Sequence, residues 1–467
     1  MEYCLIKSFE FKGNSLELLE LFKEEPFVFS LGSYLTARSG GRFSLIGFDP
    51  YETFRHRSGN GLDLLKKKFL KYYQTIPVSA LPFAAGILGF LSYDFGLHLE
   101  NVSVRSKDDL LLPDFCFGFY DCVLTIDHWE KKLIVSSSGL PEKNSLLRKK
   151  RAQWRMEQVF KKLTRYWTAK EKSAQNVFGR EEEKKELRGD IKSDFSRTVY
   201  LKAVEKILDY IRRGDVYQVN LSQRFELTQS GYERDPVRLY QRLCRVSPSN
   251  FCAYLDAGDF QIMSSSPERF LRKQKKIIQA SPMKGTRPRG RNTTEDRSNR
   301  QDLLSSPKDR AELLMITDLV RNDLGRVCRY GSVKVKRMRR LEEYATVFQT
   351  TSTIEGTMRD DCDGFDAIKT CFPGGSVTGC PKIRAMEIIE ELEPHHRGIY
   401  TGSLGYMNFR GDMDFNILIR TLLKYWNKIY FHAGGGIVAD SVPEKEYDET
   451  LVKARALRLS LQGAGHG

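Results

Sequence analysis

The chain has 467 residues, of which 40% are hydrophobic and 29% are charged, and its formal net charge is +15. This length suffices for one large domain or two ordinary ones, and the composition is that of a globular protein. No stretch approaches the roughly 18 apolar residues that span a bilayer, and the acidic start Met1–Glu2 lacks the basic segment of a signal peptide, so we expect no membrane association and a cytoplasmic location.

The number and spacing of the cysteines and the location of the positive charge argue against further classes of protein. The nine cysteines are scattered and form no Cys-x-x-Cys pair, which suits a reducing compartment and argues against a disulfide framework or a cysteine zinc site. Residues 141–192 hold 16 Lys or Arg against 8 Asp or Glu, over half of the net charge. Such a run is usually a solvated helix and linker. Because no nucleic-acid motif accompanies it, we expect no nucleic-acid partner.

The first 140 residues alternate short apolar, aromatic-rich runs with Gly turns, which predicts strands at 27–31, 83–90 and 117–124. A helical pattern follows at 145–167, and 169–191 is the best linker candidate. Beyond it come a helix at 200–213 that stops at Gly214, a strand at 216–222, and mixed strands and helices. We predict an α+β fold with two sheet-containing units. The boundaries are an N-terminal region 1–145, a basic helix and linker 146–192, and a larger catalytic region 193–467.

Lys284 and Glu268 are the most informative pair of candidate catalytic residues. Lys284 directly precedes a Gly-Thr turn, and Glu268 ends an apolar strand-like run upstream. A primary amine and a carboxylic acid that share one pocket can attack carbon and protonate a leaving oxygen. An exposed charge is the alternative for the lysine. A neighbouring basic cluster suits an acidic small-molecule substrate; it consists of Arg287, Arg289 and Arg291.

Two predicted helices carry acids that suit a metal ion. In the C-terminal helix, Ser441 to Glu444 has the pattern of a capping box, and Glu446, Glu449 and Lys453 then fall on one face. Glu312 lies along an apolar stripe of the helix that starts at Ser306–Pro307, where a carboxylate needs a partner. Acids at this spacing could hold Mg²⁺. A solvated helix face for the first set, and an ion pair with an arginine for Glu312, are the alternatives.

Glycines and an arginine complete the candidate anion site. Gly434, Gly435 and Gly436 follow an apolar strand and would let backbone N–H groups approach an anionic oxygen, although a tight turn explains them equally well. A second Gly-rich turn at 373–382 runs into a helix at 383–392 and is a plausible anion site. Arg420 ends the strand-like run 416–419, where its guanidinium could clamp a carboxylate. A surface arginine is the alternative.

Taken in order, these segments resemble those of the chorismate-utilising enzymes, a family that includes anthranilate, aminodeoxychorismate, isochorismate and salicylate synthases. The resemblance covers nearly the whole chain and implies the fold of that family, two large mostly antiparallel sheets packed together with helices outside. The segments that carry it are 41–47, 214–222, 266–270, 375–386, 433–440 and 446–451.

The resemblance also implies roles for residues. Glu312, Glu449 and Glu446 would hold Mg²⁺ against the ring carboxylate of chorismate, with Asp309 nearby or bridging through water. The substrate itself would be bound by a larger set, namely Gln218, Ser376, Thr378, Tyr400, Arg420, Gly434, Gly435, Gly436 and Lys453.

Two positions separate the members of this family. Isochorismate and salicylate synthases have a water-activating lysine where this chain has Gln218, and glutamine cannot act as that base. At position 284 the anthranilate synthases and the water-adding enzymes typically have alanine. Aminodeoxychorismate synthases of the lysine type have the Pro-Ile/Met-Lys-Gly-Thr pattern found here. The pair therefore favours the aminodeoxychorismate synthases, which act in para-aminobenzoate and folate synthesis, and anthranilate synthase is the alternative.

The implied reaction has two displacements. Lys284 attacks chorismate while Glu268 protonates the departing hydroxyl, and ammonia then expels the lysine to give 4-amino-4-deoxychorismate. Anthranilate synthases have a histidine where this chain has Gln349, which weakens the anthranilate alternative. No glutaminase-like segment is present, so a separate glutamine amidotransferase subunit is expected to supply ammonia. Residues 29–33 depart from the Leu-Glu-Ser pattern tied to tryptophan feedback, which leaves tryptophan binding open.

Overall fold

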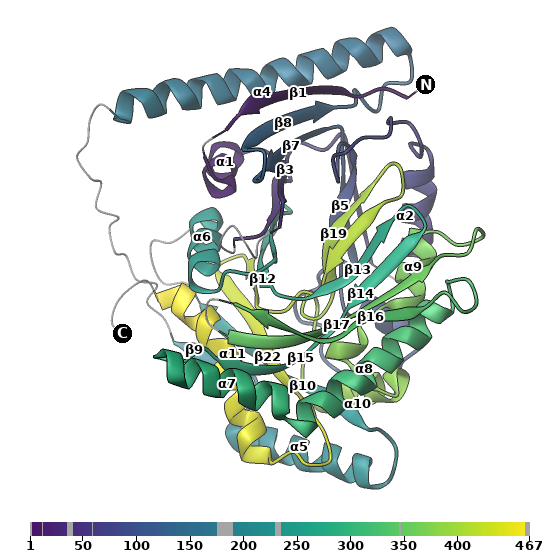
Figure 1. Cartoon of the computed structure of the whole chain (residues 1–467), viewed down its shortest axis with the longest axis vertical. Coiled ribbons are helices and arrows are strands. Elements are labelled where there is room, and N and C mark those ends of the chain that lie inside the picture. The colour runs from purple at the N-terminus through teal and green to yellow at the C-terminus, as the bar shows by residue number, and fades with distance from the viewer. Residues whose placement is uncertain are drawn as a thin grey trace.

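The computed structural model describes residues 2–11, 13–34, 41–57, 59–174, 190–228, 235–344 and 347–462, with only the backbone described for 169–174. Its strands form two large antiparallel sheets that pack together, and the longer helices lie outside them (Figure 1). This arrangement confirms the predicted α+β class and the two mostly antiparallel sheets.

The first sheet has twelve strands and combines strands from both ends of the chain. In spatial order they are β1 (Leu5–Glu10), β8 (Lys132–Ser137), β7 (Cys122–Asp127), β3 (Phe43–Gly47), β2 (Phe29–Gly32), β11 (Phe251–Asp256), β12 (Phe260–Ser266), β21 (Thr421–Tyr425), β22 (Lys428–Ile437), β10 (Gln218–Thr228) and β18 (Gly379–Cys380), with β9 (Ile191–Ser193) paired to β10.

The second sheet has ten strands and also combines strands from the early and late parts of the chain. In spatial order they are β15 (Met283–Pro288), β17 (Val347–Thr357), β14 (Ile277–Ser281), β13 (Arg269–Gln274), β20 (Met413–Asn416), β19 (Ser403–Asn408), β5 (Gly86–Leu91), β6 (Phe115–Tyr120) and β4 (Glu52–His56), with β16 (Lys334–Glu343) paired to β17.

The prediction of two separate sheet-containing units is therefore wrong. β2 pairs with β11 in the first sheet and β5 pairs with β19 in the second, so both sheets cross the predicted boundary. The physical reason is that the strands before residue 140 do not close a sheet of their own. In each sheet, the early strands leave one edge open, and a strand from the later part of the chain pairs with that edge. The centre of the predicted linker, 175–189, lies outside the described residues.

The apolar run 117–124, predicted as one strand, is divided between the two sheets. β6 ends at Tyr120 in the second sheet and β7 begins at Cys122 in the first. Asp121, at the crossing, is fully buried, and its carboxylate lies 3.3 Å from Arg155 and 3.4 Å from Arg151. Because a buried carboxylate needs such partners, these two arginines of helix α4 hold the chain at the point where it changes sheets.

The helices form at most of the predicted places. They are α1 (Ser15–Phe22), α2 (Gly61–Leu70), α3 (Phe95–Leu99), α4 (Ser145–Ala174), α5 (Arg197–Arg212), α6 (Pro236–Val246), α7 (Thr293–Ser305), α8 (Pro307–Gly325), α9 (Gly364–Cys371), α10 (Lys382–Leu392) and α11 (Pro443–Gln462), with a short 3₁₀ turn η1 (Gly375–Val377). Local signals set their ends: the Ser306 hydroxyl caps α8 by accepting from the Asp309 N–H, and Pro307 takes its first position. None of these helices is both long enough and apolar enough to cross a membrane.

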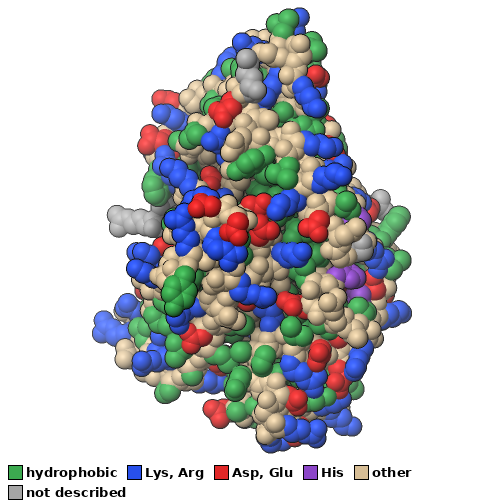
Figure 2. Space-filling view, turned by 90° about the vertical axis from the view of Figure 1, so that its right-hand side faces the viewer, with side chains coloured by type: hydrophobic (Ala, Val, Ile, Leu, Met, Phe, Trp, Pro, Cys, Tyr) green, Lys and Arg blue, Asp and Glu red, His purple; other side chains and the backbone are tan. Residues whose placement is uncertain are grey.

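Apolar side chains from both sheets fill the space between them. Phe29, Leu255 and Ile262 of the first sheet belong to the same cluster as Leu88 and Leu404 of the second. Towards one side this interior opens into a cavity of about 750 Å³, whose wall includes the segment 31–33 that departs from the tryptophan-feedback pattern. On the face shown in Figure 2, Lys and Arg side chains are interspersed with Asp and Glu rather than gathered into one patch.

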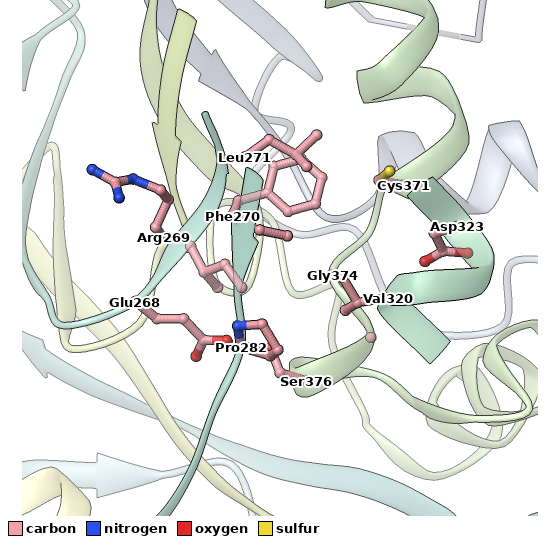
Figure 3. A pocket seen from close by; sticks show the side chains of 13 residues that line it. Glu268, Arg269, Phe270, Leu271, Pro282, Val320, Asp323, Cys371, Gly374 and Ser376 are labelled. Atoms are coloured by element: carbon pink, nitrogen blue, oxygen red, sulfur yellow. Dashed lines mark hydrogen bonds between the residues drawn. The ribbon is translucent and has the colours of Figure 1, made fainter. Parts of the chain in front are cut away.

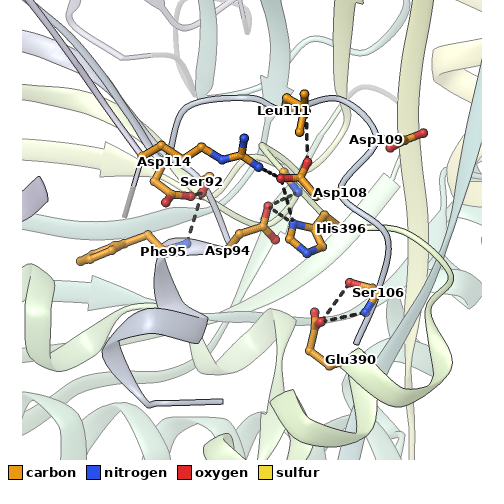
Figure 4. A network of polar contacts seen from close by, with 12 residues as sticks. Ser92, Asp94, Phe95, Ser106, Asp108, Asp109, Leu111, Asp114, Glu390 and His396 are labelled. Atoms are coloured by element: carbon orange, nitrogen blue, oxygen red, sulfur yellow. Dashed lines mark hydrogen bonds and ion pairs between the residues drawn. The ribbon is translucent and has the colours of Figure 1, made fainter. Parts of the chain in front are cut away.

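A polar network joins the loop 105–114 to Glu390 and His396, two residues that precede β19 in the chain (Figure 4). The Glu390 carboxylate accepts hydrogen bonds from the N–H groups of Arg105 and Ser106, at 3.2 and 3.3 Å. His396 Nδ1 lies 3.5 Å from Asp94 and 3.8 Å from Asp108. Burial alone lowers the pKa of His396, but the hydrogen bond and charge of Asp94 outweigh it and hold the pKa above its ordinary value.

We expect His396→Gln to lower stability in a pH-dependent way. Because the folded-state pKa is raised, the contribution of His396 is complete below the ordinary histidine pKa of about 6.5 and is lost as pH rises through the raised value. The free energy of unfolding should fall by about 1 kcal/mol in mildly acidic buffer, and the difference should fade in alkaline buffer. Urea denaturation over a pH series measures this. His98→Gln, at a more exposed histidine, is the control, and a pH-independent difference would contradict the assignment.

Candidate active site

A glycine-bearing strand forms the centre of the site. β22 pairs with β10 in a register that sets Gly434, Gly435 and Gly436 opposite Ser222, Leu221 and Asn220. The three glycines lie within the strand, so the tight-turn alternative is wrong. β21 stops pairing with β22 at Phe431. Among the described strands the glycine stretch therefore pairs only with β10, and its other edge presents backbone groups to a ligand.

The missing side chains let functional groups approach this strand from both sides. A Cβ at Gly436 would lie 2.3 Å from Gln218 Nε2 and 3.3 Å from Lys284 Nζ. A Cβ at Gly435 would lie 3.4 Å from a carboxylate oxygen of Glu446 and 3.4 Å from one of Glu449. Since successive residues of a strand face opposite sides, the glycines lie between the lysine amine and the acids of α11.

Lys284 is held at a distorted point of β15. It pairs with Thr350 of β17, whose hydroxyl donates to the Lys284 carbonyl at 2.6 Å, and the register shifts at Gly285, which has a φ of 75°. Burial lowers the pKa of Lys284, and the charge of Lys453 lowers it further, whereas the charges of Glu312, Glu268 and Glu449 oppose this. These four charges reach Lys284 only because β15, α8, α11 and the turn between β12 and β13 converge here.

Glu268 is the other member of the predicted catalytic pair. Its side chain is 3% exposed, and the Ser376 hydroxyl donates to its Oε1 at 2.6 Å. Burial raises the pKa of Glu268 to about 7, although the Ser376 hydrogen bond, the Lys284 charge and a backbone hydrogen bond from Met283 all favour the ionised form. The structure thus brings Lys284 and Glu268 within electrostatic range of each other, and the exposed-charge alternative for Lys284 is wrong.

A small cavity adjoins Glu268 and Ser376 (Figure 3). Its volume is about 20 Å³, enough for about one water molecule. Most of its wall is apolar, with Phe270, Pro282 and Val320 among the lining residues, so the carboxyl group has little competing solvent. Asp323, also on the wall, is neutralised by Lys382 Nζ at 2.8 Å.

The predicted metal-binding acids come from two helices. Glu446 is 4% exposed and accepts from the Ser441 hydroxyl at 2.6 Å. Because α11 begins at Pro443, Ser441 precedes the cap position, and its hydroxyl serves Glu446 instead of the predicted capping box. Glu449 is paired with Lys453 at 2.7 Å, and the charge of Lys453 lowers the pKa of Glu449.

Glu312 completes this set from α8. Burial raises its pKa, and the charges of Lys284 and Lys308 oppose that rise. Within the described chain Glu312 forms no ion pair with an arginine, so that alternative is wrong. Asp309, one turn earlier, is paired with Arg287 at 3.0 Å.

The predicted metal-binding acids offer carboxylate oxygens of the kind that Mg²⁺ prefers, but they do not form an enclosed metal site. Among the residues that the structure describes, no three Asp, Glu, His or Cys side chains converge closely enough to enclose a metal ion by themselves. Mg²⁺ prefers carboxylate oxygens, and it commonly binds through one or two of them plus waters and substrate. Glu446 and Glu449, which both reach Gly435, offer such oxygens, and Glu312 lies within electrostatic range of Glu449.

Tyr400 and Arg420 are two further predicted site residues. The Tyr400 ring stacks on His432 at 4.8 Å between centroids, and its hydroxyl is within electrostatic range of Lys453. Arg420 lies past the end of β20, with a φ of 51°, and not in a strand that continues to Ile419 as predicted. No carboxylate of the described chain pairs with Arg420, and burial lowers its pKa. Tyr344 lies within range of both Arg420 and Glu268.

Thr378 is a predicted site residue, but its hydroxyl points into its own loop and not into the site. It is fully buried, and its hydroxyl donates to the carbonyls of Gly374 and Gly375, at 3.0 and 3.4 Å. Thr378 therefore shapes the loop that carries Ser376. Gln218, by contrast, is fully buried with both polar atoms of its side chain unpartnered among the described residues, which leaves it available to a ligand.

Arg397 is a residue that sequence reasoning missed. Its guanidinium is 2% exposed and donates to Glu393 at 2.9 and 2.7 Å, to the Val377 and Asn220 carbonyls at 2.9 and 2.6 Å, and to the Thr401 hydroxyl at 3.3 Å. It thus joins β10, the Ser376 loop and the Tyr400 turn. In the sequence it is one basic residue after two histidines, and nothing local shows that it is buried.

Comparisons with known proteins add the following. A family model described as chorismate binding enzyme matches residues 32–458. The chain is 37% identical over 445 residues to aminodeoxychorismate synthase component 1 of Bacillus subtilis, covering 92% of this chain and 91% of that protein. It is 38% identical over 461 residues to anthranilate synthase component 1 of Thermus thermophilus, covering 96% and 95%.

Solved structures agree on the fold. Anthranilate synthase component I from Streptococcus pneumoniae superposes with a TM-score of 0.77 at 32% identity, covering 90% of this chain and 92% of that one. MenF, the menaquinone-specific isochorismate synthase from Escherichia coli, gives a TM-score of 0.75 at 18% identity, covering 99% and 95%, which is a likeness of fold alone.

We expect Arg397→Met to lower the free energy of unfolding by about 3–5 kcal/mol, because it leaves the buried Glu393 carboxylate without its charge partner. The double variant Arg397→Met with Glu393→Gln should recover part of this loss. Urea denaturation measures both. Arg384→Met, which removes a more exposed arginine from α10, is the control and should cost less than about 1 kcal/mol. Equal losses for Arg397→Met and Arg384→Met would contradict the assignment.

Proposed function

The chain belongs to the chorismate-binding enzyme family, and we propose that within it the protein converts chorismate and ammonia to 4-amino-4-deoxychorismate. The observation that carries the proposal is the placement of Lys284. Its amine faces Gly436 in a partly buried position, and a carboxyl group with a raised pKa, Glu268, lies within electrostatic range. An amine whose pKa is lowered by burial is prepared to act as a nucleophile.

The substrate is a dianion, and the site offers groups for both of its carboxylates. Arg420, which has no carboxylate partner in the described chain, and Tyr400 bind one carboxylate. The open edge of the glycine strand and Lys453 add further donors. Glu312, Glu446 and Glu449 would hold Mg²⁺, which would supply positive charge for the ring carboxylate.

The first displacement joins Lys284 to the ring. The neutral Lys284 nitrogen forms a bond to C2, both ring double bonds shift by one position (C1=C2 to C1=C6 and C5=C6 to C4=C5), and the C4–O bond breaks. Glu268 gives its proton to the departing hydroxyl, which leaves as water, and the proton released by the lysine nitrogen restores the acid. A carboxyl pKa near 7 suits this task, because the group is substantially protonated at neutral pH yet readily gives up its proton.

The second displacement releases the product. Ammonia forms a bond to C4, both ring double bonds shift back to C5=C6 and C1=C2, and the bond between C2 and the Lys284 nitrogen breaks. The lysine leaves with a proton taken from the attacking nitrogen, so the sum is chorismate plus ammonia giving 4-amino-4-deoxychorismate and water. We propose that a separate glutamine amidotransferase subunit supplies the ammonia.

Anthranilate synthase activity is the second candidate, since this chain is as similar to an anthranilate synthase as to an aminodeoxychorismate synthase. The two are distinguished by incubating the protein with chorismate, Mg²⁺ and ammonium. Accumulation of 4-amino-4-deoxychorismate supports the proposal. Fluorescent anthranilate with an equal amount of pyruvate would overturn it in favour of the second candidate.

We expect Lys284→Ala to abolish the covalent intermediate and to lower the rate of chorismate amination by at least about 10³-fold. Mass spectrometry of protein quenched with chorismate should find, on the peptide that contains Lys284, an adduct of chorismate less one water, and only in the unsubstituted protein. Lys276→Ala, at an exposed lysine paired with Asp360, is the control. Normal turnover by Lys284→Ala would sink the nucleophile assignment.

We expect kcat to fall as pH rises above about 7, because the acid form of Glu268 is then lost. The Ser376 hydroxyl stabilises the ionised form, so Ser376→Ala should raise the pKa of Glu268 and move this alkaline limb to higher pH. The pH profile of kcat measures the shift, with Ser305→Ala at an exposed serine as control. A limb that stays in place or moves to lower pH would contradict the acid role.

A further inference from the structure

One face of the β10–β22 pair brings Asn220 next to the proposed nucleophile. Residues paired across two antiparallel strands project to the same face, so Asn220, which pairs with Gly436, shares the face of that glycine. A Cβ at Gly436 would lie 2.3 Å from Gln218 Nε2 and 3.3 Å from Lys284 Nζ. Because the Cβ positions of such a pair are only about 5 Å apart, the Asn220 side chain is a close neighbour of the Lys284 amine.

The same face carries Tyr400 further along the strand. His432 precedes Gly436 by four residues in β22 and therefore projects to the same side, and the Tyr400 ring stacks on it with 4.8 Å between centroids. Arg397 joins the two parts: it donates to the Asn220 carbonyl at 2.6 Å, and its guanidinium lies 5.6 Å from the centre of the Tyr400 ring. Asn220 thus shares its face with Tyr400 as well as with the lysine amine.

The polar side chains on this face of β10 differ in whether the protein itself satisfies them. The Arg224 guanidinium donates to Asp109 at 2.8 and 2.7 Å, and the Ser222 hydroxyl donates to Glu393 at 2.9 Å. Asn220 is only 7% exposed, yet its amide nitrogen has no hydrogen-bond partner among the described residues. A buried donor without a partner costs stability, so its presence calls for an acceptor that arrives with a ligand.

The position of Asn220 in the strand does not depend on its side chain. Its backbone N–H donates to the Thr378 carbonyl at 2.8 Å, and its carbonyl accepts from Arg397 at 2.6 Å. The strand is therefore fixed on both sides of the residue by main-chain groups. The amide has no structural bond to make, which leaves it available to a substrate.

We propose that Asn220 is a further substrate-binding residue, whose amide N–H donates to an oxygen of the enolpyruvyl group of chorismate. The inference rests on the proposed function, in which Lys284 attacks C2 and Tyr400 with Arg420 binds a carboxylate. Since the ring carboxylate is assigned to the acids, the carboxylate at Tyr400 is that of the enolpyruvyl group. This group is attached to C3, the neighbour of the attacked carbon, so it runs from the lysine amine to Tyr400 along the face that carries Asn220.

Kinetics with chorismate test the inference. Asn220→Leu keeps a branched side chain of similar shape, and Asn220→Ala cannot obstruct the site. Both should raise KM for chorismate about tenfold, the scale of one hydrogen bond to a charged oxygen, with little change in kcat or in KM for ammonium. An unchanged KM for chorismate in Asn220→Ala would overturn the inference.

Asn408→Leu is the matched control, because Asn408 is a buried asparagine that the protein satisfies. Its amide nitrogen donates to the Pro82 carbonyl at 3.0 Å, and its oxygen accepts from the N–H groups of Arg410 and Asp412 at 2.9 and 3.0 Å. Asn408→Leu should melt at a lower temperature and keep its KM. Asn220→Leu should melt no lower than the unsubstituted protein, because it removes a buried group that had no partner. A fall in melting temperature as large as that of the control, together with a lower kcat, would show a structural role and overturn the inference.

Action through Tyr400 is the alternative that a double variant distinguishes. Burial raises the pKa of Tyr400, and the Asn220 side chain is close enough to oppose that rise, but its amide nitrogen is not hydrogen-bonded to the tyrosine. If Asn220 contacts the substrate itself, the effects of Asn220→Ala and Tyr400→Phe on KM should multiply in the double variant. A double variant no worse than Tyr400→Phe would make Asn220 a positioning residue for the tyrosine and overturn the substrate contact.

The outcomes separate the inference from the function on which it rests, because KM is measured as consumption of chorismate whichever product forms. If the protein makes 4-amino-4-deoxychorismate and Asn220→Ala keeps a normal KM, the inference alone is overturned. If anthranilate and pyruvate form instead, the proposed function is overturned, and the KM of Asn220→Ala still decides the substrate contact. If chorismate is not consumed at all, both are overturned.

Discussion

The pairing of β10 with β22 is the constraint on which the site depends. The register places three consecutive glycines beside Asn220, Leu221 and Ser222, past the point where β21 stops pairing. A slip of one residue would exchange the two faces of the strand, so that Gly436 would no longer face Lys284 and Gly435 would no longer face the acids of α11. The close approaches of 2.3 to 3.4 Å to a missing Cβ show that larger side chains have no room here.

Buried charge is the second condition that the fold has to meet. Arg397 satisfies its guanidinium with Glu393, three further acceptors and no solvent, and in doing so fixes β10, the Ser376 loop and the Tyr400 turn relative to one another. Glu268 and Lys284 are treated differently: burial shifts their pKa values towards the neutral forms, which are the forms that the proposed mechanism requires. The Arg397 charge is fully paired, whereas the charges of the proposed catalytic pair are left partly uncompensated.

Much of the site could be predicted from the sequence, because each residue was marked by an unusual local setting. Lys284 precedes a Gly-Thr turn, Glu446 and Glu449 share a helix face, and the glycines follow an apolar strand; the structure brings all of them together. Thr378 was misplaced because a hydroxyl in a Gly-rich turn can face a ligand or its own loop, and only packing decides. Ser441 was assigned as the cap because the helix begins one residue later than predicted, and Arg397 carries no local mark of burial.

The sequence by itself determined the secondary elements, the family resemblance and most of the candidate residues, since periodicity, caps and motifs are properties of neighbours along the chain. The tertiary structure alone decided that both sheets draw strands from either side of residue 192 and that the chain changes sheets at Asp121. The sheet pairings join residues more than two hundred positions apart, and the two arginines that meet Asp121 lie 30 and 34 positions after it. Strand pairing and charge compensation at such separations leave no periodic trace in the chain, because many partners are compatible with each local pattern.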